Sequence, residues 1–299
     1  MEKIIAEIRG WQKKRNAVIL AHNYQPAEIQ DIADYLGDSL DLSKKAASAE
    51  AEVIVFCGVR FMAETAKILS PQKTVLLPDL EAGCPLADMV TPGDIRKRRL
   101  EYPGATVVTY INSSAEVKAE SDYICTSSNA LNLIEKIPEE TILFFPDQNL
   151  GDYIRERTGK KMVLWPGYCP THMVFLPAEL ESLRKKHPAA VLMVHPECRR
   201  EIRKMADLVL STGGMVKWVK ENNPKEVIVG TEIGMINRLK RENPAINYIP
   251  GSSRAVCPNM KKITLEKVLW SLKEMKPEIT VPADIAECSR KALERMLQF

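Results

Sequence analysis

Short apolar runs rich in Val, Ile and Leu alternate with amphipathic stretches along the whole chain. The run at 17–21 is representative, because no polar residue interrupts it, and parallel strands that are buried on both faces show this pattern. We predict strands at 17–21, 53–56, 74–77, 105–109, 122–125, 141–145, 162–165, 190–194, 207–210, 226–229 and 246–249. We predict helices at 27–36, 40–50, 61–69, 92–102, 129–136, 150–158, 178–186, 215–221, 235–241, 265–273 and 283–297. The alternation predicts an α/β fold with parallel sheets covered by helices.

The dipeptide Cys-Pro occurs three times, at Cys84, Cys169 and Cys257. Successive cysteines are 85 and 88 residues apart. In the three segments that lead to the cysteines, the first predicted strand ends at His22, Tyr110 and His195, which lie 62, 59 and 62 residues before the cysteine. We therefore predict an internal threefold repeat. Its expected parts are unit one (1–85), unit two (86–172), unit three (173–260) and two C-terminal helices (261–299) that pack on the body. Unit one is expected to differ by an extra early helix and by lacking the last helix and strand.

Composition narrows the class of protein. The chain has 299 residues, of which 45% are hydrophobic and 27% charged, with a net charge of +3, so a nucleic-acid partner is not indicated. No run of about 18 apolar residues predicts a membrane span, and the charged N-terminus does not resemble a signal peptide, so we expect a cytoplasmic protein. Seven cysteines in a chain of this size favour metal-binding or reactive thiols over a disulfide framework.

Polar residues gather where the predicted strands end. Ligands of parallel sheets bind beyond the carboxyl ends of the strands, near helix N-termini that attract anions. The first strands lead to His22-Asn23-Tyr24, Tyr110-Ile111-Asn112 and His195-Pro196-Glu197, and the second strands lead to Gly58, Ser127 and Ser211-Thr212. If the units face one another, all these residues line one central cavity together with the three thiols.

The three Cys-Pro cysteines have two candidate roles. They could bind zinc with a histidine as fourth ligand, although the short spacings of structural zinc sites are absent. They could instead hold three irons of a 4Fe-4S cluster and leave the fourth iron open to a substrate. We expect Cys57, Cys125 and Cys198 to be packed in the core, and Cys288 to be inert.

Ser39 and His172 each allow two interpretations, and a lysine pair allows one. Ser39 caps a helix, binds a carboxylate, or does both. His172, three residues after Cys169, is expected to contact either a ligand of the cluster or the substrate. Lys261 and Lys262 are interpreted as a solvated helix start.

Taken together, these segments resemble the quinolinate synthase family over essentially the whole chain. The matching stretches are Leu20–Gln25, Asp31–Asp34, Gly37–Ser39, Cys84-Pro85, Tyr110–Ser113, Ile124–Ser127, Cys169–His172, Val194–Cys198, Ser211–Gly213, Gly230–Met235 and Cys257–Lys262. The resemblance implies three similar α/β/α sandwich domains, arranged with pseudo-threefold symmetry around a central active site. It also implies a transferase-type condensation of iminoaspartate with dihydroxyacetone phosphate to quinolinate, with loss of phosphate and two waters, in NAD biosynthesis.

The same resemblance implies roles for particular residues. The family's 4Fe-4S cluster would be held by Cys84, Cys169 and Cys257, with one iron lacking a protein ligand. Tyr24, Glu197, His22 and Tyr110 would be catalytic. Substrate contacts would come from His22, Ser39, Tyr110, Ile111, Asn112, Ser127, His172, His195, Pro196, Glu197, Ser211 and Thr212. Some family members carry a C-terminal Cys-x-x-Cys-x-x-Cys switch, but here only Cys288 lies in that region.

Two other classes of protein share part of this pattern. One is a different enzyme on a trilobed three-cysteine scaffold, such as the isoprenoid diphosphate reductase or a diphthamide synthesis enzyme. The other is a redox sensor or electron carrier, which would normally give its cluster four protein ligands. The converging acid and base groups favour the condensing enzyme. Its partners would be its two small substrates, and functional coupling to an enzyme that supplies iminoaspartate is a further option.

Overall fold

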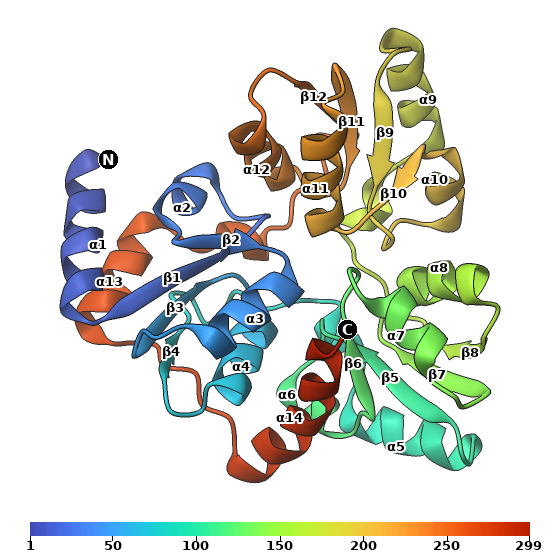
Figure 1. Ribbon diagram of the computed structural model, residues 1–299, viewed down its shortest axis with the longest axis horizontal. Coiled ribbons are helices and arrows are strands. Elements are labelled where there is room, and N and C mark those ends of the chain that lie inside the picture. The colour runs from blue at the N-terminus through green and yellow to red at the C-terminus, as the bar shows by residue number, and fades with distance from the viewer.

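The computed structural model describes residues 1–299 and contains three four-stranded parallel sheets. Their strand orders are β2-β1-β3-β4, β6-β5-β7-β8 and β10-β9-β11-β12, so each unit repeats one topology. The strands are β1 (Ala17–His22), β2 (Tyr35–Gly37), β3 (Val53–Cys57), β4 (Thr74–Leu76), β5 (Thr106–Tyr110), β6 (Tyr123–Cys125), β7 (Thr141–Phe145), β8 (Lys161–Leu164), β9 (Val191–Val194), β10 (Leu208–Val209), β11 (Glu226–Gly230) and β12 (Asn247–Pro250). Figure 1 shows the three sheets in three lobes around a common centre. The predicted α/β fold with three similar units is confirmed.

Helices connect and cover these strands. The α-helices are α1 (Glu2–Lys14), α2 (Ala27–Ile32), α3 (Ser39–Ser48), α4 (Arg60–Leu69), α5 (Pro92–Glu101), α6 (Ala115–Ala119), α7 (Ala130–Lys136), α8 (Gln148–Thr158), α9 (Pro177–Lys186), α10 (Arg200–Met205), α11 (Thr212–Asn222), α12 (Gly234–Glu242), α13 (Leu265–Glu274) and α14 (Ala283–Leu297). Three 3-10 helices, η1 (Ala87–Met89), η2 (His172–Val174) and η3 (Asn259–Lys261), follow the three Cys-Pro dipeptides. None of the helices is both long and apolar enough to cross a bilayer.

One aspartate in each unit shows how closely the repeat is kept. Its carboxylate accepts the backbone N–H of a residue in the first strand, at 2.7 to 2.8 Å, and its own N–H donates to the carbonyl of that same residue. The pairs are Asp34 with Ile19, Asp122 with Val107 and Asp207 with Leu192, and the separation is 15 residues in all three. These two hydrogen bonds fix the start of the second strand beside the first.

The structure corrects the prediction for unit one. The helix expected at 27–36 ends at Ile32, and Tyr35–Gly37 forms β2 beside β1. Gly37 ends this strand, and Asp38 rather than Ser39 caps α3, so Ser39 is the first residue of the helix. With β2 included, unit one has the complete repeat, so the expected extra helix and the expected lack of the last helix and strand are wrong. The short helices α6 and α10 are the counterparts of α2 that the sequence pattern did not reveal.

The C-terminal helices pack on the body, as predicted. α13 contacts α1, and an antiparallel bridge joins Leu76 of β4 to Glu278. α14 contacts α4, α6 and β6, which places it between units one and two (Figure 1). The largest apolar core runs through unit one, part of unit two and this tail, while the rest of unit two has a separate small cluster and unit three has two of its own. Polar contacts therefore carry much of the boundary around unit three.

Candidate active site

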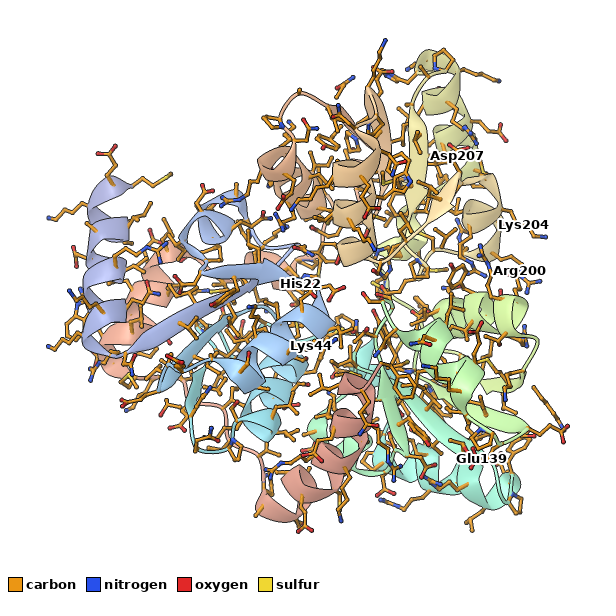
Figure 2. The ribbon with its side chains drawn as sticks, in the orientation of Figure 1. His22, Lys44, Glu139, Arg200, Lys204 and Asp207 are labelled. Carbon is orange, nitrogen blue, oxygen red and sulfur yellow. The ribbon has the colours of Figure 1, made fainter.

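A cavity of about 70 Å³ lies where the three units meet. Most of the residues singled out in the sequence line it, and Figure 2 shows one of them, His22, near the centre of the molecule. The lining residues that were predicted are His22, Tyr24, Ser39, Tyr110, Asn112, Ser127, His172, His195, Glu197, Thr212, Cys84, Cys169 and Cys257. Three predicted contacts, Ile111, Pro196 and Ser211, lie next to lining residues without lining the cavity themselves.

The three Cys-Pro cysteines lie at equivalent turns of the three units, which we call the cysteine corners. In each, the backbone N–H of the third residue after the cysteine faces the sulfur: Ala87 for Cys84, His172 for Cys169 and Met260 for Cys257. These residues lie in the 3-10 helices η1, η2 and η3. Burial raises the pKa of all three thiols, and for Cys84 it raises the pKa to about 12.

These corners fit an iron–sulfur cluster. Three sulfurs share one cavity, close enough that the charge on one raises the pKa of another. Backbone N–H groups aimed at cysteine sulfur are one of the ways in which a protein tunes such a cluster. Burial makes free thiolates costly here, and iron ligation would compensate that cost. Cys57, Cys125 and Cys198 are fully buried elsewhere, as expected, and Cys288 is exposed.

Glu197 is a buried carboxylate of the cavity with a phenol and two imidazole rings beside it. It follows β9 and is 3% exposed, and its Oε1 accepts a hydrogen bond of 2.6 Å from the Tyr110 hydroxyl. Its Oε2 lies 2.8 Å from Nδ1 of His172, although no straight N–H···O line joins the two atoms. Burial alone would raise the pKa of Glu197, but His172, His195 and the Tyr110 hydrogen bond outweigh it and hold the pKa below its usual range. Glu197 of unit three is therefore a carboxylate that accepts a hydrogen bond from a phenol of unit two.

His22 is the last residue of β1 and His195 directly follows β9, and both have the same local geometry. In each, Nδ1 accepts the backbone N–H of the second residue along the chain, Tyr24 at 3.2 Å and Glu197 at 3.3 Å. The proton of a neutral ring must then reside on Nε2. Burial lowers the pKa of His22 to about 4 and that of His195 to about 3, so both are neutral at pH 7. They offer uncharged N–H donors, and Nε2 of His195 lies 3.3 Å from the Ser127 hydroxyl.

Helix starts from the three units meet at the same cavity. Ser39 and Thr212 are the first residues of α3 and α11, and Ser127 precedes α7. Asp38 caps α3 through the N–H groups of Leu40 and Asp41 and also accepts the Ser128 hydroxyl. The hydroxyls of Ser39, Ser127 and Thr212 and the positive ends of the helix dipoles make this side of the cavity suitable for carboxylates or phosphate.

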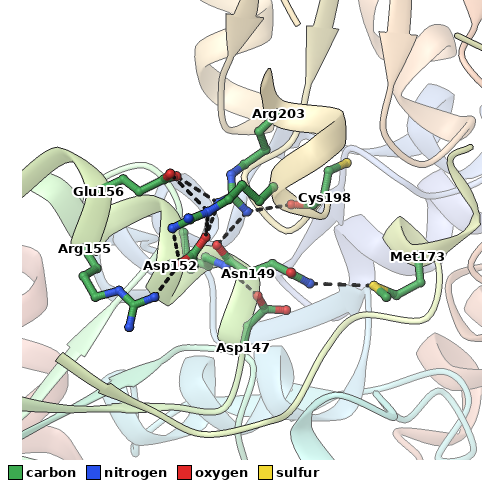
Figure 3. A network of polar contacts seen from close by, with 10 residues as sticks. Asp147, Asn149, Asp152, Arg155, Glu156, Met173, Cys198 and Arg203 are labelled. Carbon is green, nitrogen blue, oxygen red and sulfur yellow. Dashed lines mark hydrogen bonds and ion pairs between the residues drawn. The ribbon is translucent and has the colours of Figure 1, made fainter. Parts of the chain in front are cut away.

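An ion-pair network braces the turn that carries Glu197. Figure 3 shows Arg203 of α10 reaching from unit three into α8 of unit two. Its guanidinium donates to the carbonyls of Cys198 (2.8 Å) and Asn149 (3.0 Å) and to the carboxylate of Asp152 (2.7 Å). The Arg203 side chain is 4% exposed, so these contacts are shielded from solvent. The network holds residue 198, next to Glu197, at a fixed place relative to unit two.

Several residues of the site escaped the sequence analysis. Thr231 lies within hydrogen-bond distance of Tyr24 and His172, and Glu232 accepts the backbone N–H of Cys257. Lys261 pairs with the fully buried Glu232 at 2.9 Å, so its interpretation as part of a solvated helix start is wrong. The sequence did contain a signal for Thr231 and Glu232, because both follow a predicted strand. Ser211 uses its hydroxyl to cap α11, and its Oγ lies 2.9 Å from the Ser128 hydroxyl oxygen.

Comparison with known proteins agrees with this geometry. The family model described as "Quinolinate synthetase A protein" matches residues 6–298. The chain belongs to the quinolinate synthase family. It is 54% identical to the quinolinate synthase of Dehalococcoides mccartyi (strain CBDB1) over 99% of this chain and 98% of that one. It is 50% identical to that of Desulforudis audaxviator, over 99% and 98%, and 49% identical to that of Methanoregula boonei, over 97% and 96%. Membership of the family implies an iron–sulfur cofactor, in agreement with the three corners.

Proposed function

We propose that this protein is a quinolinate synthase, which condenses iminoaspartate with dihydroxyacetone phosphate to quinolinate and releases phosphate and two waters. The observation that carries the proposal is a single buried cavity lined by three equivalent cysteines, a fixed carboxylate and two phenols. Relatives of the same length and about 50% identity bear this name. We further propose that the unit boundaries lie at 85/86, 172/173 and 260/261.

The cavity supplies groups for each part of this reaction. The Nε2–H groups of His22 and His195 would donate to substrate oxygens without adding charge. Ser39, Ser127 and Thr212, at the helix starts, would hold the carboxylates and the phosphate. Because His22 and His195 are neutral, charge balance on the anionic substrates would depend on these helix starts and on the cofactor.

Proton transfer would fall to Tyr24 and Glu197, with Tyr110 beside them. Ring formation requires protons to move between carbons and a carbonyl and a hydroxyl oxygen to leave as water. Glu197, held as a carboxylate, is suited to accept a proton, whereas burial and the nearby Glu197 charge raise the pKa of Tyr24 and keep its phenol protonated as a donor. Cys84, Cys169 and Cys257 would hold a 4Fe-4S cluster, whose iron without a protein ligand supplies Lewis-acid chemistry at the cavity.

The direct test is an anaerobic assay for quinolinate with both substrates and cluster-loaded protein. We expect product from the unsubstituted chain. Glu197→Gln, which keeps the size of the side chain, should retain iron and lose turnover. A fully loaded sample that forms no quinolinate would refute the proposed function. Iron, sulfide and zinc analysis of the same sample distinguishes a cluster from a zinc site.

A further inference from the structure

Each unit contains one buried polar side chain that donates a hydrogen bond back to its own chain. This side chain belongs to the fourth residue of a short helix, α2, α6 or α10, and its acceptor is the carbonyl five residues earlier. The pairs are Gln30 with Gln25 at 2.9 Å, Lys118 with Ser113, and Arg203 with Cys198 at 2.8 Å. The repeat has therefore kept one contact in three units while using three different residue types as the donor.

The acceptor carbonyls depend on these side chains. Gln25, Ser113 and Cys198 are fully buried, and no backbone N–H donates to their carbonyls. Each lies directly before the N-cap of its helix. Apolar residues at this position and at the fourth helical position often pack together and fix the angle at which the chain enters the helix. Here a hydrogen bond between the same two positions takes that role, and losing the donor would leave a buried carbonyl unsatisfied.

Each of these carbonyls ends a turn that carries residues of the cavity. The residue directly before the carbonyl lines the cavity in all three units, and so does the residue two positions before that one. These lining residues are His22 and Tyr24, Tyr110 and Asn112, and His195 and Glu197. Each donor therefore holds a turn that presents two groups to the substrates, although the donor itself does not line the cavity.

The same three side chains also contact a neighbouring unit, and they do so at equivalent places. The contacted residue is the fourth after the third strand of that unit. The pairs are Gln30 of unit one with the carbonyl of Gly234 of unit three at 3.1 Å, Arg203 of unit three with the carbonyl of Asn149 of unit two at 3.0 Å (Figure 3), and Lys118 of unit two with the ring of Phe61 of unit one, 5.3 Å from its centre. One contact therefore crosses each of the three boundaries, and together they form a closed ring around the cavity.

We propose that Gln30, Lys118 and Arg203 are positioning residues for the reaction: each holds one turn of the cavity wall and ties it to the neighbouring unit. The proposal rests on the proposed function, and it assigns no bond making or breaking to the three residues. It also accounts for their polarity. A buried amide, ammonium or guanidinium is costly to desolvate, but an apolar side chain would supply neither the hydrogen bond within the turn nor the polar contact across the boundary.

The test begins with Lys118→Met, which keeps the length of the side chain and removes its charge and its donors. The variant should fold, because Glu64, the unit-one carboxylate that accepts the N–H of Ala115, keeps its ion pair with Arg60 at 3.0 Å. At equal cluster content we expect kcat/KM to fall about 10- to 100-fold, since displacing a group by about 1 Å has effects of this size. Lys118→Gln should recover most of the rate, because Gln30 makes the equivalent contact in unit one.

Lys73→Met is the matched control for removing a buried lysine. The ammonium of Lys73 also donates to two carbonyls, those of Ala46 and Ala49, but all three residues belong to unit one and none lines the cavity. We expect Lys73→Met to change the melting temperature and to leave kcat/KM unchanged. An equal loss of activity in the two methionine variants would overturn the proposal, as would unchanged kcat/KM in Lys118→Met or failure of Lys118→Gln to recover the rate.

Hydrogen exchange tests the same contacts without reference to activity. In Gln30→Met, the amides of residues 23–25 and, across the boundary, those of residues 234–238 at the start of α12 should exchange about 10-fold faster. The amides of residues 197–198, in the turn that Arg203 still holds, should not change. Unchanged exchange at 234–238 would overturn the tie between units. If the unsubstituted chain forms no quinolinate, the proposed function fails, whereas the exchange rates still decide whether the turns are held as proposed.

Discussion

The cysteine corners of units two and three have the same backbone contacts, but the charge of the carboxylate beside the cysteine is balanced by a cation in only one of them. In each, a carboxylate follows the third strand and accepts an N–H at the start of the next helix, Leu150 to Asp147 and Gly234 to Glu232, both at 2.7 Å. In each, the backbone N–H of the unit's cysteine also faces that carboxylate. Glu232 has the ammonium of Lys261 at 2.9 Å, whereas Asp147 has no cation and one of its oxygens lacks a partner.

Unit one shows that this carboxylate is not required by the fold alone. Val59 occupies the corresponding place after β3, so unit one has no carboxylate there. Asp79 follows the fourth strand, β4; it accepts the N–H of Glu81 at 2.8 Å and pairs with Lys267, and no hydrogen bond joins it to Cys84. The difference indicates that two corners use a buried carboxylate to hold the cysteine backbone, and that only the corner of unit three balances the charge.

Removing a thiol should have the largest effect. Cys169→Ser deletes one of the three proposed ligands, and we expect the anaerobically purified protein to lose nearly all its bound iron. Cys125→Ser is the matched control, because Cys125 is fully buried in the same unit and lies outside the cavity. Iron and sulfide analysis decides the outcome. Equal iron in both variants would remove Cys169 from the ligand set.

Glu232→Gln should have the next largest effect, because it leaves Lys261 without its counter-ion and weakens the hold on Cys257. We expect loss of the cluster to a chelator to become about 10- to 100-fold faster, which is the usual range for residues that support metal ligands. The rate is read from the decay of cluster absorbance under anaerobic conditions.

Adding Lys261→Met to Glu232→Gln provides the control for charge. Breaking a buried ion pair from one side costs more than replacing both partners, so the double variant should hold its cluster longer than the single one. A double variant that loses its cluster faster than Glu232→Gln would show that Lys261 acts independently of Glu232, through its bond to the carbonyl of Tyr24.

Asp147→Asn should have the smallest effect of the three. Asn caps a helix about as well as Asp, and no cation loses a partner, so we expect cluster loss within about a factor of three of the unsubstituted protein. Asp79→Asn serves as the baseline, since Asp79 does not contact a cysteine corner. If Asp147→Asn proves as damaging as Glu232→Gln, the two corners depend on negative charge equally and the contrast between them is wrong.

Much of the fold was open to prediction because the buried strands are uninterrupted apolar runs and the Cys-Pro corners mark the repeat. The prediction failed where a strand is too short to show a pattern. Tyr35–Gly37 is too short to show a strand pattern, and it follows an amphipathic stretch that reads as one helix. The hydrogen bonds between Asp34 and Ile19 hold this segment beside β1. They join residues that are 15 apart in the sequence, so no local pattern indicates them.

The site was predictable where a residue lies at a strand end and less so where its role depends on another unit. His22, Tyr110 and Glu197 fell into the first group. Thr231 fell into the second, because its contact with Tyr24 spans 207 residues and crosses a unit boundary. The sequence favours a surface position for Lys261 for a similar reason. Its partner Glu232 lines a cavity that forms only when the three units of the chain pack together.

The C-terminal segment that packs on unit one has a consequence for the order of events on the ribosome. The edge strand β4 receives backbone hydrogen bonds from Ile279 to Val75, and Leu77 donates to Pro277. α1 is covered by α13. Synthesis proceeds from the N-terminus, so β4 stays uncovered until about 200 further residues have been made, and the apolar face of α1 until about 250 have been made. The first lobe to emerge is the last to be completed.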